Sequence, residues 1–201
     1  GSEMCIRDRS RSLGMEFATA AFHNSYYFHK DDNVITNKEE VCGDFEKLIN
    51  LQLKEKHPKS WMRAFFNMGL INYIEGSRRM LPCQAGEMNF FVEPYGDIYP
   101  CNGLEKKYWK KSMGNIRETP NFKEIWEGEQ AEQVRQMVRR CPKNCWMVGT
   151  ASPVMHKYIK YPLKWALKNK LRSLQGKTAC LDKCWYNVGQ DPSQGDLREV
   201  F

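Results

Sequence analysis

Eight cysteines in a chain of 201 residues limit what this sequence can form more than any other feature. Cysteines at this density indicate disulfides, a metal site or redox chemistry, and spacing and compartment decide among these. Cys83 and Cys101 flank a predicted hairpin, while Cys141 and Cys145 lie at the ends of one predicted tight turn that contains Pro and Asn. A hairpin brings distant cysteines to one rim, and thiols at the two ends of a turn can face a common centre. Four thiolates suit a tetrahedral zinc ion or an iron-sulfur cluster, and both remain open beside simple burial as small apolar side chains.

The other four cysteines carry weaker signals. Cys5 lies in the polar opening GSEMCIRDRSRS, which has no helical or strand period and resembles a translated sequencing-adaptor string. Residues 1–13 are therefore predicted to be a non-native or disordered leader. Cys42 lies on an amphipathic helix, which favours packing. Cys180 and Cys184 repeat the spacing of the predicted turn and are either further metal ligands or a loop pair that can form a disulfide.

The composition is that of a folded globular protein. Hydrophobic residues make up 41% and charged residues 27%, which excludes a disordered or fibrous chain. No apolar run reaches the roughly 18 residues that a transmembrane helix needs. No secretory signal opens the sequence, and a domain of this length does not depend on disulfides to fold. A reducing, cytoplasmic compartment is therefore expected.

Hydrophobic periodicity and turn signals predict the order of the elements. Thr36 or Asn37 can cap the first long helix, and an acidic residue three positions on would complete a capping box. A domain boundary is predicted just before Pro82, where helical periodicity gives way to strand and turn signals. The predicted elements are a buried strand at 16–22, a helix from the cap to His57, a largely buried helix from about Lys59, a hairpin pairing 90–92 with 98–101, short helices near 122–126 and 134–138, and a basic helical stretch at 154–174 broken at Pro162.

The segment from Cys83 to Cys145 resembles the SPASM or twitch auxiliary-cluster domain that follows the barrel of radical SAM enzymes. That pattern is a cysteine, 9 to 15 residues, a glycine, four residues and a cysteine, and Cys83, Gly96 and Cys101 fit it. The strings DIYPC, MGNI and EIW resemble the family's usual course between its cysteine groups. The resemblance implies that Cys83, Cys101, Cys141 and Cys145 hold one auxiliary 4Fe-4S cluster.

The same resemblance implies a mixed α/β fold in two parts. Residues 14–81 would be the last elements of a partial (β/α) barrel, and residues 82–150 a small domain of a hairpin plus helices. Residues 151–201 would follow as a basic, amphipathic helical tail. If 16–22 is a barrel strand, its end points toward the substrate side, so His23, Asn24 and Tyr26 become candidate substrate contacts, although a polar strand end explains them equally.

Two departures from the family pattern narrow the function. A full SPASM domain carries seven cysteines, so this segment looks like the single-cluster twitch form. The catalytic CxxxCxxC motif of radical SAM enzymes is absent, because Val148 and Asn187 occupy the third positions after the two paired cysteine groups. The chain is therefore expected to be a C-terminal fragment, inactive alone. S-adenosyl-L-methionine and a second 4Fe-4S cluster would belong to the intact parent, which would act on a peptide or small molecule.

A basic segment closes the interpretable sequence. Residues 154–177 contain seven Lys or Arg and no Asp or Glu, and these seven equal the formal net charge of +7. The interleaved apolar residues make the segment amphipathic, so it suits an anionic membrane surface, nucleic acid or an acidic partner, or is simply a solvated basic face. This leaves a rival function from another class: a non-catalytic tetrathiolate zinc module that binds nucleic acid or a protein partner.

Overall fold

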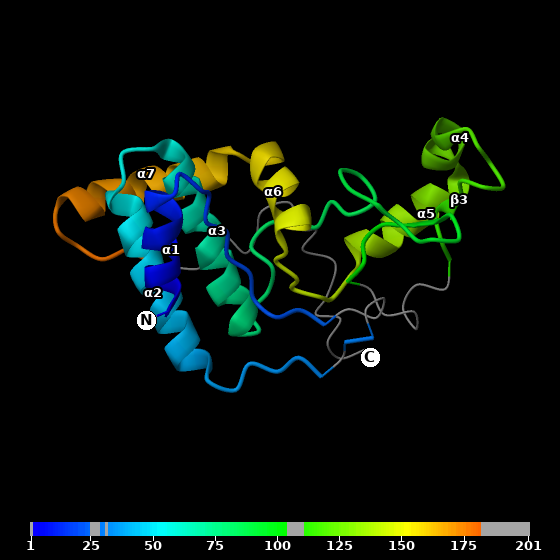
Figure 1. Cartoon of the computed structure of the whole chain (residues 1–201). Coiled ribbons are helices and arrows are strands. Elements are labelled where there is room, and N and C mark those ends of the chain that lie inside the picture. Colours follow the sequence, from blue (N-terminus) through cyan, green and yellow to red (C-terminus); the bar gives the residue numbers. More distant parts are fainter. Residues whose placement is uncertain (1, 25–28, 31, 104–110, 182–201) are drawn as a thin grey trace.

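The computed structural model describes residues 2–24, 29–30, 32–103 and 111–181, and within them the protein is mainly helical with one small antiparallel sheet. Figure 1 shows the helices α2, α3 and α7 at one end of the molecule and the sheet with α4 and α5 at the other. The elements in chain order are α1 Ser2–Ser12, α2 Lys38–Lys54, α3 Pro58–Ile74, β1 Phe91–Val92, β2 Asp97–Tyr99, β3 Gly114–Asn115, α4 Phe122–Glu127, α5 Glu129–Arg139, α6 Val148–Lys157 and α7 Lys160–Leu174.

The two long helices α2 and α3 begin and end close to where the sequence predicts. Asn37 is the N-cap of α2, but its side chain caps no backbone N–H and instead donates to Glu40 Oε2 at 3.0 Å, so the predicted capping box is wrong. Helix α3 begins at Pro58, where the missing N–H removes no helical hydrogen bond. More than half of α3 is buried, which confirms that this helix is apolar on most sides.

Helices α2, α3, α6 and α7 enclose the larger of two hydrophobic cores. Trp146 and Trp165 are the largest fully buried side chains among the described residues, and both lie in this core. The Trp165 ring meets Phe65 edge-on, with centroids 5.6 Å apart. The other buried members of this core are Ile49, Leu53, Ala64, Met68, Leu70, Ile71, Met80, Leu81, Ala151, Val154, Met155 and Ala166. This core fixes α2 and α3 against each other and includes Trp146, the residue that follows Cys145.

The smaller core lies under the sheet. The predicted hairpin is confirmed: Phe91 pairs with Tyr99 and Val92 with Ile98, in antiparallel register. Its turn uses Gly96 at φ +95°, a left-handed conformation that favours glycine. The third strand, β3, was not predicted. The buried members of this core are Ala85, Ile98, Met113, Ile125, Ala131, Val134 and Val138.

The predicted strand at 16–22 is wrong, because residues 15–24 form no sheet ladder. The segment still has the two-residue period of a strand: burial alternates residue by residue from Phe17 to Asn24. Side chains of α3 hold it in place. Thr19 Oγ1 donates to Asn67 Oδ1 at 2.5 Å, and Tyr73 Oη donates to the carbonyl of Phe22 at 2.9 Å. Without a partner strand among the described residues, the alternation produces no ladder.

The structure differs from two further expectations. Residues 1–13 are expected to be a non-native or disordered leader, whereas Ser2–Ser12 form helix α1, in which Arg7, only 7% exposed, donates to Glu55 Oε1 at 2.5 Å. The break predicted at Pro162 falls earlier, at Tyr158 and Ile159, and Pro162 lies in the first turn of α7, where proline removes no helical hydrogen bond. Crossing a membrane would require a longer and more apolar helix than any in the described part of the chain.

Candidate metal centre

Three of the four predicted ligand cysteines pack against the smaller core. Cys83, Cys101 and Cys141 all contact its buried residues. The loop after Cys83 is tied to the end of β2, because Asn89 Nδ2 donates to the carbonyl of Pro100 at 3.2 Å. The loop after Cys101 is tied to the turn after α5, where Lys143 Nζ donates to the carbonyl of Gly103 at 3.3 Å. Residues far apart in the sequence therefore meet at one edge of the sheet.

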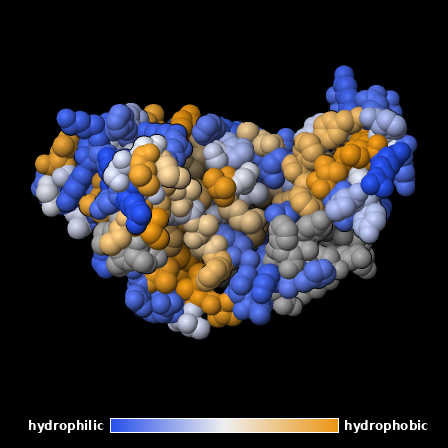
Figure 2. Space-filling model, in the orientation of Figure 1, coloured by the Kyte–Doolittle hydropathy of each residue, from blue (hydrophilic) through white to orange (hydrophobic). Residues whose placement is uncertain are grey.

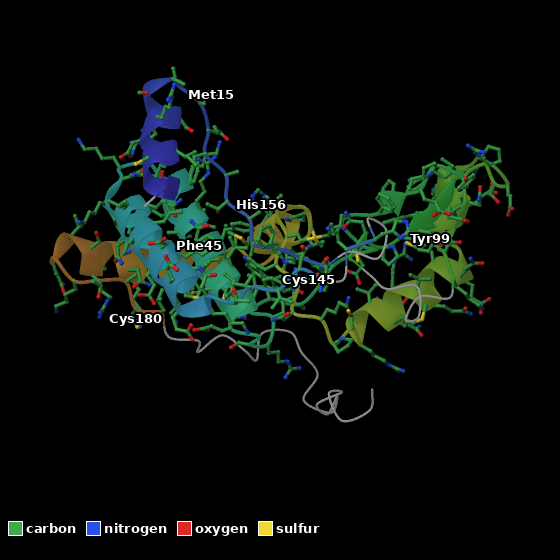
Figure 3. All side chains as sticks on the ribbon, turned by 60° about the horizontal axis from the view of Figure 1, so that its bottom comes forward. Met15, Phe45, Tyr99, Cys145, His156 and Cys180 are labelled. Carbon is green, nitrogen blue, oxygen red and sulfur yellow. The ribbon has the colours of Figure 1, made fainter. Side chains whose placement is uncertain are left out.

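The fourth cysteine, Cys145, is held by the larger core. Asn144 Nδ2 donates to the carbonyls of Ser77 at 2.9 Å and Tyr73 at 3.3 Å, at the end of α3. Arg79 Nη1 donates to the carbonyl of Cys145 itself. In Figure 3, Cys145 lies between Phe45 of α2 and Tyr99 of β2. The turn from Cys141 to Cys145 thus bridges the two cores.

All four thiols interact with one another. The charge of each of Cys83, Cys141 and Cys145 bears on Cys101, and the remaining three pairs interact as well. Burial first, and then the neighbouring sulfurs, raise the pKa of Cys101 to about 12, against the N–H of Gly103. Burial likewise raises the pKa of Cys141 to about 11, opposed by a backbone hydrogen bond from Lys143. The Cys101 and Cys141 thiols are therefore protonated at neutral pH in the metal-free protein.

The donor set fits a thiolate-bound metal or cluster, although no three of the thiols lie as close together as bound ligands would. Within the described residues, no three His, Cys, Asp or Glu side chains are close enough to form a metal shell. Four soft sulfur ligands in one partly buried region are what an iron-sulfur cluster or a tetrathiolate zinc ion requires. Loading therefore requires the thiols to release protons and to draw together around the metal.

Comparison with protein families decides what kind of segment this is. Residues 83–147 match the SPASM iron-sulfur cluster-binding domain. The resemblance that the cysteine spacing implies is thereby confirmed, and these residues are called the SPASM segment below. The match implies iron-sulfur cluster binding and is consistent with the C-terminal part of a radical SAM enzyme that carries a SPASM domain. No curated protein and no solved structure matches the chain.

His23, one of the predicted substrate contacts, lies beside the residue that follows Cys145, but its contacts are structural. Its ring stacks on Tyr73 with centroids 4.0 Å apart, and its Nδ1 donates to the carbonyl of Ala21 at 2.8 Å. Its Nε2 accepts the backbone N–H of Trp146 at 3.1 Å. Burial first, with the Arg79 charge adding to it, lowers the pKa of His23, so the neutral ring fastens the segment before α2 to the residue after Cys145.

Among the other candidate residues, the three that the structure describes, Asn24, Cys42 and Cys180, have contacts away from the four cysteines. Asn24 Oδ1 accepts the N–H of Asn33 at 3.0 Å, and Tyr26 and Cys184 lie outside the described residues. Cys42 packs against the larger core, as predicted. Cys180 lies by α7, where its backbone N–H donates to Asn169 Oδ1 at 2.6 Å, well apart from Cys145 in Figure 3.

Sequence reasoning missed Arg79, a buried charged residue that donates to the carbonyl of Cys145. This side chain is 5% exposed, donates to the carbonyls of Leu81 at 2.9 Å and Thr150 at 3.0 Å, and lies over the Trp146 ring at 5.3 Å. Its charge lowers the pKa of Cys145, although burial raises that pKa overall. Nothing in the sequence distinguishes Arg79 from its exposed neighbour Arg78.

Proposed function

We propose that the SPASM segment holds an auxiliary 4Fe-4S cluster through Cys83, Cys101, Cys141 and Cys145, within the C-terminal region of a radical SAM enzyme. The observation that carries this proposal is the packing of Cys83, Cys101 and Cys141 against one core, with Cys145 at the end of the turn that leads from Cys141 to the other core. The match to the SPASM domain over the same residues supports iron as the metal.

The residues around the thiols suit a negatively charged group. Backbone N–H groups of Gly103 and Lys143 donate to the sulfurs of Cys101 and Cys141, and the charges of Lys143 and Arg79 favour the thiolate form of Cys145. Hydrogen bonds and positive charge of this kind stabilise thiolate ligands and set the potential of a cluster. When bound, such a cluster supplies an electron donor or acceptor, or a site for substrate.

In this proposal residues 14–81 end the barrel of the parent protein. The alternating burial from Phe17 to Asn24 is the pattern of a strand, and preceding parts of the parent would supply the strand that pairs with it. S-adenosyl-L-methionine and the second 4Fe-4S cluster belong to that preceding part, and the substrate is a peptide or small molecule. A reducing, cytoplasmic setting suits thiolate ligands, which must stay unoxidised.

Anaerobic reconstitution with iron and sulfide tests the proposal. We expect about four iron and four sulfide per chain, with the charge-transfer absorption of a cluster. Serine at any of the four cysteines should lower the iron content, whereas Cys42→Ser, a substitution outside the group, should not. Stoichiometric zinc without iron, together with salt-sensitive nucleic-acid binding, would contradict the proposal and support the zinc module instead.

A further inference from the structure

Helix α7 has a buried face that packs on the protein and an exposed face that carries both apolar and basic side chains. One face carries Pro162, Trp165, Ala166 and Asn169, all buried against the larger core. Lys170 fixes the helix from its side, because its Nζ donates to the carbonyls of Leu53 at 2.8 Å and Glu55 at 2.9 Å at the end of α2. The orientation of α7 is therefore set by packing, and its outer face is presented in a defined direction.

The outer face is an apolar stripe along the whole helix. Its members are four or three positions apart, so they follow one another along the same side. They are Ile159, Leu163, Leu167, Leu171 and Leu174, which are 46%, 44%, 47%, 61% and 72% exposed. Single exposed leucines are ordinary on a soluble protein, but a contiguous stripe marks an interaction surface.

A row of lysines runs beside this stripe. Lys160, Lys164 and Lys168 are exposed and share its four-residue spacing. No acidic residue occurs between Val148 and Leu181, so this stretch of the sequence is strongly basic. The surface is therefore apolar along its centre and positive along its flank.

We propose that this face of α7 binds an anionic lipid surface, with the leucines entering the boundary between headgroups and acyl chains and the lysines meeting the headgroups. A single helix face is convex, and Figure 1 places α7 at the end of the molecule away from the sheet. Apolar and charged side chains alternate over that end of the molecule in Figure 2. Nucleic acid would engage the lysines but leave the leucines in water, whereas a bilayer surface takes up both.

Vesicle flotation of the full chain tests the proposal. We expect binding to phosphatidylcholine vesicles that contain about 30% phosphatidylserine, and much weaker binding to phosphatidylcholine alone. Changing Lys160, Lys164 and Lys168 together to Gln should weaken binding about 100-fold, at roughly tenfold or less per lysine. The matched control, Gln at Lys47, Lys54 and Lys56, removes the same charge from another exposed surface and should leave binding nearly unchanged.

Leucine variants distinguish insertion of the apolar stripe into the lipid from attraction by charge alone. Changing Leu163, Leu167 and Leu171 together to Gln should abolish flotation with both lipid mixtures, while circular dichroism stays as in the parent chain because these side chains are exposed. Equal loss of binding in the lysine control would overturn the proposal. So would leucine-dependent self-association, or binding to an RNA homopolymer, in a chain that does not float with either vesicle.

Discussion

The Trp146 ring packs directly on α3 at Gly69, where there is no side chain. Replacing Gly69 tests whether this contact fixes the end of the cysteine turn. A Cβ at Gly69 would lie 2.1 Å from both Cε2 and Nε1 of Trp146, too close for any real contact. The same indole N–H donates to the carbonyl of Phe66 at 2.8 Å. Because Trp146 follows Cys145 directly, Gly69→Ala should displace the end of the cysteine turn as well as the ring.

The magnitude follows from three opposing contributions. Alanine in a helix interior gains about 1 kcal/mol over glycine. Overpacking a filled core costs about 1–3 kcal/mol, and the upper end applies because the whole indole must move. Losing the hydrogen bond from Trp146 costs about 1 kcal/mol more. Gly69→Ala should therefore lower the free energy of unfolding by about 2–3 kcal/mol.

Gly43 provides the matched control for this substitution. It lies within α2, and a Cβ there would meet nothing within 4 Å. Gly43→Ala should therefore stabilise the protein by up to about 1 kcal/mol through helix propensity alone. Denaturant unfolding followed by tryptophan fluorescence measures both variants. A Gly69→Ala protein as stable as Gly43→Ala would refute the packing of Trp146 against α3.

Three further predictions concern other parts of the structure. Arg79→Gln should cost about 3 kcal/mol of unfolding free energy, because buried carbonyls lose hydrogen bonds from a charged donor, while Arg78→Gln at the exposed neighbour should change it by less than about 0.5 kcal/mol. The metal-free protein should lose stability as pH rises from about 9 toward 12: unfolded Cys101 releases its proton near its usual pKa of 9.0, whereas the folded thiol, with its pKa raised to about 12, keeps it. Cys101→Ser should flatten that decline in pH-dependent unfolding, and an unchanged decline would contradict the assignment. Asn121→Ala should cost about 1 kcal/mol, because its side chain caps α4 by accepting a backbone N–H, and thermal melting measures this loss.

Local signals in the sequence were enough to predict the elements that depend on local chemistry. The hairpin follows from alternating apolar residues around a turn that contains Gly96, and α3 begins at Pro58, where proline favours a first turn. The strand β3 has only Gly114 and Asn115, which form no alternating pattern. Its position comes from pairing with β2, which no local pattern reveals.

Long-range contacts explain what the sequence could not predict. Helix α1 has little apolar character of its own, and Arg7 reaches Glu55 in a distant part of the chain. The cysteine spacing predicted four candidate ligands, and in the structure three of them pack against the smaller core while the fourth lies at the end of the turn beside the larger core. The spacing could not show that Arg79 would bind the carbonyl of Cys145 or that His23 would accept the N–H of Trp146, because both side chains act through backbone groups.

The division of the four cysteines between two cores has a consequence for the proposed cluster. Cys83, Cys101 and Cys141 pack against the sheet, whereas Cys145 is held by the helical core through its neighbour Trp146. Ligands drawn from both cores would crosslink them, so cluster binding free energy would add to the docking of the SPASM segment on α3. The thiols must then approach across an interface rather than within one rigid unit.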